Sequence, residues 1–191
     1  MPLWGQGCAA SLYVMRTLVL DPPTAGLDPL LEGRRRSGLD RNDEVWEGVY
    51  HMVPAPSGPH SSVEWQLARL LMPLAEHAGL HAGGQFNLGE GEEDFRVPDG
   101  GLHRVPPLVT WYSTAALVLE IVSPNDESWE KLPFYAAHEV EEVLIVDPRE
   151  RSVSWLALGD GDYRPIEHSG LVDLGTRELA EQLDWPAIDR G

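Results

Sequence analysis

The apolar run Leu117-Val118-Leu119-Glu120-Ile121-Val122 constrains the fold more than any other stretch of this chain. It has the length of a strand, and its leucine and β-branched side chains favour a central strand that is largely buried. One carboxylate, that of Glu120, lies inside it. Because an ionised carboxylate loses its hydration in such a place, it needs an ionic partner or a metal ion. From the residues alone, the alternatives are a salt bridge and a position where the strand end meets solvent.

The residues before this strand predict a hairpin and a helix. The β-prone stretch 44–53 turns at Glu47-Gly48, as a hairpin does. A helix follows, because apolar residues recur at three- and four-residue spacing from Val63 to Leu74. Ser61 with Glu64 predicts a capping box at its start, and Gly79 is placed to end it.

A second helix is predicted after the apolar strand. The turn and cap formers of 123–126 precede four side chains that share one helical face. These are Trp129, Leu132, Tyr135 and Ala136. Pro133 lies inside the pattern and should weaken or kink the helix. An apolar strand at 143–146 and a closing hairpin of 153–158 with 163–166 complete an α/β domain with a mixed sheet.

Residues 1–40 contain several prolines and glycines and the basic run Arg34-Arg35-Arg36, without sustained periodicity. We expect them to be a loose N-terminal extension of one domain at 41–187, since 191 residues suffice for one sizeable core. Met15 is a candidate for the true start; alternatively, the residues before it add a strand. The single cysteine, Cys8, cannot form an internal disulfide, and no apolar run approaches the roughly 20 residues of a membrane span. A cytoplasmic protein is expected.

The chain is strongly acidic. It has 14 Lys and Arg against 31 Asp and Glu, a formal net charge of -17 at pH 7. Affinity for nucleic acid comes largely from basic side chains that neutralise phosphates, so this chain should bind a polyanion poorly without a local basic patch or a bound cation. The charge favours either a metal-bridged nucleic-acid site or a different ligand.

Asp99 is the residue best suited to share a metal ion with Glu120. It follows Pro98 at the end of the β-prone stretch 95–97, and carboxylates from two neighbouring strands can hold one hard cation such as Mg²⁺. The alternative is that Pro98-Asp99-Gly100-Gly101 is only a turn.

Lys131 belongs to the helix that follows the strand of Glu120. Its ammonium group can reach back over the carboxylates, to orient an attacking water or stabilise developing negative charge. The alternative is a surface ion pair with Glu127, four residues earlier, which would be worth only a few tenths of a kcal/mol.

These residues resemble the bacterial Uma-type restriction endonucleases, a family of the PD-(D/E)XK nuclease superfamily. The resemblance covers residues 42–158, including the hairpin at 44–48 and the proline-rich turn at 54–60. The matching motifs are Pro98-Asp99, Leu119-Glu120-Ile121-Val122-Ser123-Pro124, Asp126, Lys131, Tyr135 and Leu144-Ile145-Val146-Asp147.

The resemblance implies a restriction-endonuclease-like mixed sheet flanked by helices, with an N-terminal β-hairpin. It also implies that Asp99 and Glu120 are the ligands of Mg²⁺ or Mn²⁺, with the backbone carbonyl of Ile121 as a third. The superfamily usually places its lysine two residues after the glutamate, where this chain has Val122. The Uma-type pattern takes the lysine from the following helix, which matches Lys131.

Two further residues enter through the resemblance. Glu44 matches a hairpin carboxylate that can add to the metal shell, and its alternative is a solvated strand residue. His60 matches the histidine before the first helix, where a local hydrogen-bonding role is the alternative to acid–base chemistry.

The function expected from these residues is metal-dependent hydrolysis of DNA phosphodiester bonds by an endonuclease, with DNA bound through the metal. Two alternatives stay open: an interaction module that kept the nuclease fold without efficient catalysis, and a hydrolase of a small phosphoester. The sequence also leaves a homodimer open, and a membrane partner is not expected.

Overall fold

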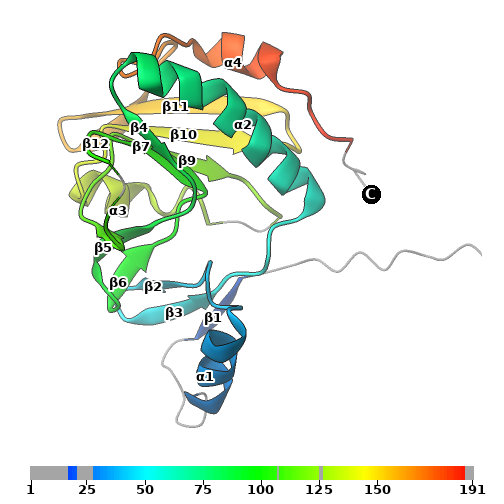
Figure 1. Ribbon diagram of the computed structural model, residues 1–191, viewed down its shortest axis with the longest axis vertical. Coiled ribbons are helices and arrows are strands. Elements are labelled where there is room, and N and C mark those ends of the chain that lie inside the picture. Colours follow the sequence, from blue (N-terminus) through cyan, green and yellow to red (C-terminus); the bar gives the residue numbers. More distant parts are fainter. Residues whose placement is uncertain (1–16, 21–27, 107, 125–126, 188–191) are drawn as a thin grey trace, which may run out of the picture.

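The computed structural model describes residues 17–20, 28–106, 108–124 and 127–187 (Figure 1). Cys8, Met15 and Asp126, which the sequence singled out, lie outside these residues. So does the strand considered for the residues before Met15. The four helices of the described part are α1 (Asp28–Ser37), α2 (Gly58–His77), α3 (Leu132–Ala137) and α4 (Thr176–Gln182).

The strands of the described residues form two mixed sheets. The first has the order β1-β3-β2-β6-β5-β8, with β1 (Leu18–Leu20), β2 (Glu44–Trp46), β3 (Val49–Met52), β5 (Asn87–Gly91), β6 (Asp94–Arg96) and β8 (Trp111–Tyr112). The second has the order β12-β11-β10-β9-β7-β4, with β4 (His81–Gly83), β7 (Gly100–His103), β9 (Leu117–Ile121), β10 (Glu142–Asp147), β11 (Ser152–Gly159) and β12 (Asp162–Pro165). The β5–β8 and β9–β10 pairs are parallel, and the other pairs are antiparallel.

The expected class, mixed β-structure flanked by helices with an opening hairpin, is confirmed. The strands are divided between two sheets where the sequence suggested one. The chain passes between the sheets several times, and one crossing is at Pro98-Asp99, because β6 before this pair belongs to the first sheet and β7 after it to the second. Asp99 therefore stands where the two sheets meet.

Strand β9 is buried along its whole length, as the apolar run predicted. Its side chains alternate between two cores, because successive residues of a strand point to opposite faces. Leu117, Leu119 and Ile121 pack on the face covered by α2 and α4, whereas Val118 packs on the face of α3 with Tyr135. Glu120 follows the same alternation and faces α3.

Helix α2 covers one face of the second sheet with a buried stripe of four residues at four-residue spacing, Val63, Leu67, Leu71 and Ala75. The predicted capping box is wrong, because the helix begins earlier. Ser57 is the N-cap, its side chain accepts from the backbone N–H of His60, and Pro59 occupies the first turn. The predicted end is confirmed, since Gly79 has φ +72° just after the helix.

Helix α3 is shorter than the pattern predicted. It begins at Leu132, so Trp129 lies before it and is half-exposed. The expected kink at Pro133 is wrong, because this proline lies in the first turn, where a missing N–H costs no helical hydrogen bond. Lys131 takes the N-cap position and Tyr135 is fully buried one turn later.

Within the expected N-terminal extension, β1 pairs with β3 at the edge of the first sheet, and α1 follows. Arg34 of α1 is anchored by Asp43, with 2.6 Å between Nη2 and Oδ1. This pair joins α1 to the segment that leads into β2. The boundary between residues 40 and 41 stays a prediction.

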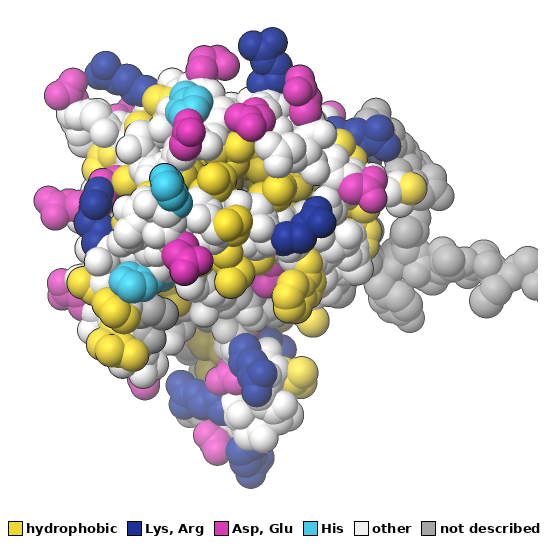
Figure 2. Space-filling view, turned by 45° about the horizontal axis from the view of Figure 1, so that its top comes forward, with side chains coloured by type: hydrophobic (Ala, Val, Ile, Leu, Met, Phe, Trp, Pro, Cys, Tyr) yellow, Lys and Arg dark blue, Asp and Glu magenta, His cyan; other side chains and the backbone are white. Residues whose placement is uncertain are grey.

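The surface reflects the acidic composition. On the face that Figure 2 presents, acidic side chains are scattered among hydrophobic ones, while Lys and Arg gather at the lower end, over α1. None of the helices that the structure describes is long and apolar enough to cross a membrane.

Candidate active site

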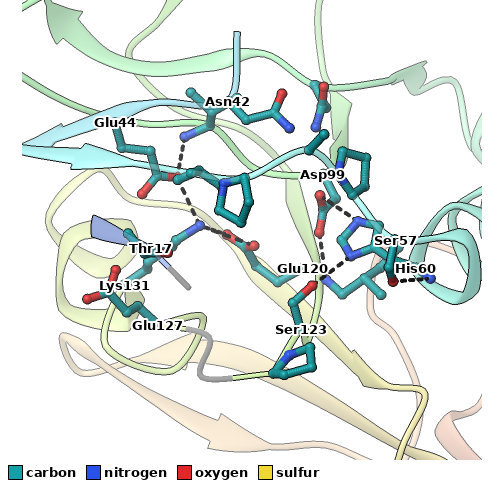
Figure 3. Close-up of a pocket in the computed structure, with 18 residues that line it drawn as sticks. Thr17, Asn42, Glu44, Ser57, His60, Asp99, Glu120, Ser123, Glu127 and Lys131 are labelled. Carbon is teal, nitrogen blue, oxygen red and sulfur yellow. Dashed lines mark hydrogen bonds and ion pairs between the residues drawn. The ribbon is translucent and has the colours of Figure 1, made fainter. Parts of the chain in front are cut away.

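The five side chains singled out from the sequence line one pocket of about 100 Å³ (Figure 3). The pocket lies where the β2–β3 hairpin, the start of α2, the turn after β6, the end of β9 and the start of α3 meet. These elements supply Glu44, His60, Asp99, Glu120 and Lys131, respectively.

Asp99 is fixed between α2 and β9. Its Oδ2 accepts from the backbone N–H of Ile121 at 2.8 Å, and its Oδ1 lies 3.0 Å from Nε2 of His60. The side chain is thus more than part of a turn, because it joins two distant elements. Each carboxylate oxygen has two lone pairs, so these contacts leave Asp99 able to accept further ligands.

Glu120 is 3% exposed. Its carboxylate accepts from Nζ of Lys131, at 3.1 Å and 3.3 Å, and from the hydroxyl of Tyr135. Burial raises the pKa of Glu120 to about 8, with contributions from the carboxylates of Asp99 and Glu44, although Lys131 acts in the opposite direction. Of the two alternatives to a metal, the salt bridge is present, and the solvent-facing strand end is not.

Lys131 bridges two carboxylates. Its Nζ lies 2.9 Å from Oε1 of Glu44 and 3.1 Å from Oε1 of Glu120. Burial alone would lower the pKa of Lys131, but these two carboxylates outweigh it and raise the pKa. The alternative partner of Lys131, Glu127, instead contacts His51, with 3.0 Å between Oε2 and Nδ1.

Glu44 is 2% exposed, so it is not a solvated strand residue. Its Oε1 accepts from the backbone N–H of Val97 at 2.8 Å as well as contacting Lys131. Its Oε2 accepts from the indole N–H of Trp46 at 2.7 Å. Both oxygens are therefore engaged, and the carboxylate anchors Lys131 to the hairpin.

His60, in the first turn of α2, joins two other parts of the pocket. Its Nδ1 lies 3.2 Å from the hydroxyl of Ser123, beyond the end of β9, and its Nε2 contacts Asp99. The ring thereby holds the Asp99 carboxylate in one orientation (Figure 3).

Several residues of the pocket were missed from the sequence as parts of the site. Tyr135 was recognised only as part of a motif and an apolar face, yet it lies one helical turn after Lys131 and donates to the same carboxylate. That four-residue spacing is the signal that could have revealed it. Asn42, Ser123 and Glu127 also line the pocket. Ser123 had entered only as part of a motif and Glu127 only as a surface partner of Lys131, while nothing in the sequence pattern distinguished Asn42.

The donors of the pocket fit a hard divalent cation. No group of three or more His, Cys, Asp or Glu side chains is gathered as a metal cage in the described part of the chain. Mg²⁺, however, is usually held by one or two carboxylates together with waters. Asp99 and Glu120 provide two carboxylates at one pocket, and Ile121, which follows Glu120, donates its backbone N–H to Asp99. Its carbonyl as a third ligand stays a prediction.

The family model described as "Uma2: Putative restriction endonuclease" matches residues 38–186. This chain belongs to the Uma2 family. The match includes every element that lines the pocket except the segment of Thr17, and it extends beyond the residues 42–158 that carried the resemblance.

A solved structure supports the fold of this Uma2 protein. It is the crystal structure of a putative nuclease belonging to DUF820 from Anabaena variabilis ATCC 29413, with a TM-score of 0.61 and 16% sequence identity. The similarity covers 73% of this chain and 90% of that one. No curated protein matches the chain. At this identity the structural likeness shows a shared nuclease-like fold, and the chemistry has to be argued from the pocket.

Proposed function

We propose that this Uma2 protein is a divalent-metal-dependent endonuclease that hydrolyses phosphodiester bonds of DNA. The observation that carries the proposal is the meeting of Asp99, Glu120 and Lys131 in one pocket. These side chains come from segments far apart in the sequence. A DNA substrate, Mg²⁺ or Mn²⁺ as the ion, a homodimer and a cytoplasmic location belong to the same proposal.

Asp99 and Glu120 would hold the ion, which supplies a Lewis acid that activates a water and neutralises charge on the scissile phosphate. His60 and the N–H of Ile121 fix the carboxylate of Asp99. Tyr135 and Lys131 fix that of Glu120. The site is therefore pre-organised by the protein's own hydrogen bonds.

Lys131 has the position to act on the reacting groups. Its Nζ lies at the wall of the pocket, within 2.9 Å of Glu44 Oε1 and 3.1 Å of Glu120 Oε1. A cation so placed can orient the attacking water or stabilise the negative charge that develops on phosphate oxygens. Glu44 acts through Lys131, by keeping the ammonium group beside Glu120.

A nicking assay on supercoiled plasmid tests the proposal. We expect cleavage by the wild type with Mg²⁺ or Mn²⁺ and none with a chelator. Asp99→Asn and Glu120→Gln should abolish cleavage and the heat of Mn²⁺ binding in calorimetry. Glu76→Gln, at an exposed position of α2, is the matched control and should behave as the wild type. Cleavage that survives in Asp99→Asn would refute the assigned ligands.

A second function, hydrolysis of a small phosphoester, is favoured by the charge of the chain. With such a substrate, a net charge of -17 would not have to be overcome along a strand. Hydrolysis of a chromogenic phosphodiester without any plasmid cleavage would support this function. Neither hydrolysis nor metal binding would favour an interaction module.

A further inference from the structure

A second hollow adjoins the candidate active site at Asp99. It has a volume of about 250 Å³ and lies between α2 and the strands β4, β7 and β9. Asp99 lines both hollows, so they are neighbours at this residue. All other lining residues of the second hollow are apolar or glycine, except Glu64. If a polymer were bound at the active site, the unit next to the reacting one would therefore lie over an apolar surface.

A glycine keeps the strand wall of this hollow free of a side chain. A Cβ at Gly100 would lie 3.2 Å from the carbonyl oxygen of Gly83, on the same face as Leu119. The strands can approach this closely only without side chains there. At Gly84, by contrast, a Cβ would meet nothing within 4 Å. A larger residue at Gly84 can therefore fill the hollow without disturbing the backbone.

Helix α2, which forms one wall of the hollow, carries two large apolar side chains in solvent. Trp65 is 78% exposed and Met72, which lines the hollow, is 56% exposed. They are seven residues apart on α2 and so lie on the same side of the helix. Helical side chains lean toward the N-terminus, which directs the indole of Trp65 toward the end of α2 that carries His60. Figure 2 shows hydrophobic side chains gathered near the middle of the face that it presents, between isolated charges.

The charges at the hollow exclude a phosphate as its occupant. No Lys or Arg of the described residues lines it, and its two charged residues, Glu64 and Asp99, are both acidic. Burial raises the pKa of Glu64, and the negative charge of Asp99 raises it further. A nucleobase fits these conditions, because it is flat and uncharged and its exocyclic amino group can donate to a carboxylate.

We propose that this hollow is a nucleobase subsite for the nucleotide beside the scissile phosphate, with Trp65 as the stacking side chain on its rim. The inference rests on the proposed nuclease function and specifies its substrate class, a strand with unpaired bases. A paired base cannot enter without leaving the duplex, which costs a few kcal/mol. Stacking would also give an acidic protein affinity that its few cations do not provide.

Binding of labelled 12-nucleotide strands, followed by fluorescence anisotropy, tests the subsite. The probes are a single strand, its duplex and an abasic strand with the same phosphates, all with Ca²⁺ to hold back hydrolysis. The wild type should prefer the single strand. Trp65→Ala and Trp65→Leu should weaken that binding by about 5- to 150-fold, whereas Trp65→Phe should retain it, because stacking needs a ring. Gly84→Leu should weaken it by filling the hollow.

Leu108→Ala is the control, since Leu108 is 85% exposed on another loop. Equal binding of the normal and abasic strands, or a Trp65→Ala protein that behaves like the control, would overturn the subsite. So would sedimentation as a dimer that Trp65→Ala dissociates, because the hollow would then be covered by a second copy. Strand binding that depends on Trp65 without metal-dependent cleavage would refute the nuclease function and keep the subsite. Metal-dependent cleavage that stays unchanged in the Trp65 variants would refute the subsite and keep the nuclease function.

Discussion

Replacing Glu120 by glutamine should make the metal-free protein more stable at pH 8 while abolishing hydrolysis. Burial raises the pKa of Glu120 to about 8 from its ordinary value of 4.5. The folded-state value lies above the unfolded one, so the stabilisation is complete below pH 4.5 and is lost as the pH rises to about 8. Glutamine resembles the protonated acid and does not lose a proton over this range.

The magnitude follows from the pKa. Each tenfold change in the ionisation equilibrium is worth about 1.4 kcal/mol. Compared with a side chain that never ionises, Glu120 therefore lowers the free energy of unfolding by about 4 kcal/mol at pH 8 and by under about 1 kcal/mol at pH 5. The new amide nitrogen faces Lys131 and should cost about 1–3 kcal/mol at both pH values. Glu120→Gln should therefore be about 1–3 kcal/mol more stable at pH 8 and less stable than the wild type at pH 5.

Urea unfolding with a chelator at pH 5, 6.5 and 8 measures this difference. The variant should gain about 3–4 kcal/mol relative to the wild type between pH 5 and pH 8. Other titrating groups are present in both proteins, and Glu76→Gln at an exposed position should follow the wild type. A difference between Glu120→Gln and the wild type that is the same at every pH would refute the argument, because Glu120 would then be ionised throughout.

Three further changes test other contacts of the site. Lys131→Met removes the cation between Glu44 and Glu120 and should lower the free energy of unfolding by about 3–5 kcal/mol at pH 8, and by less at pH 5, where Glu120 is protonated; an equal loss at both pH values would contradict this. Tyr135→Phe removes a buried donor to Glu120 and should cost about 1–3 kcal/mol in urea unfolding; no loss would mean that the bond contributes nothing. Ser57→Ala removes the N-cap of α2 and should lower the free energy of unfolding by about 0.5–2 kcal/mol, whereas Ser61→Ala should change it little. Thermal unfolding of both variants measures this, and a larger loss in Ser61→Ala would contradict the assigned cap.

The fold could be predicted wherever one periodicity ran without interruption. Strand β9, helix α2 and the β11–β12 hairpin each show a clear pattern of apolar residues, and each is present. The ends of the helices were less predictable. Ser61 and Glu64 satisfy the spacing of a capping box, but Pro59 already has the fixed φ that begins a helix, and Ser57 precedes it. Two local signals competed, and the one nearer the turn determined the start.

The division into two sheets could not be predicted from local pattern. Pro98-Asp99 reads as a turn, and a turn can join two strands of one sheet or carry the chain from one sheet to another. The choice depends on which partners β6 and β7 find, and these partners are distant: Val45 opposite Phe95, and Leu119 opposite Gly100. Sequence spacing has no information on such pairings without homologous sequences.

The members of the site were easier to name than their contacts. A carboxylate in an apolar strand has few explanations, so Glu120 directed attention to Asp99 and Lys131. The partner of Glu120 was not predictable, because it depends on where α3 lies. The helix starts at Leu132, and this places Lys131 and Tyr135 one turn apart on the side that faces β9. A longer helix, as the pattern predicted, would not by itself have fixed that orientation.

The arrangement of charges explains why such a site would take up a divalent cation. Lys131 is shared by two buried carboxylates, Glu44 and Glu120, so one positive charge faces two negative ones, and Asp99 adds a third nearby. Burial makes the ionisation of Glu120 costly in the fold, and the neighbouring carboxylates of Asp99 and Glu44 add to that cost. A second positive charge placed between Asp99 and Glu120 would offset that cost, because the ionised carboxylate would then be the favoured form. The destabilisation of the metal-free site and its affinity for a cation thus have one physical cause, and substitutions that relieve the first should weaken the second.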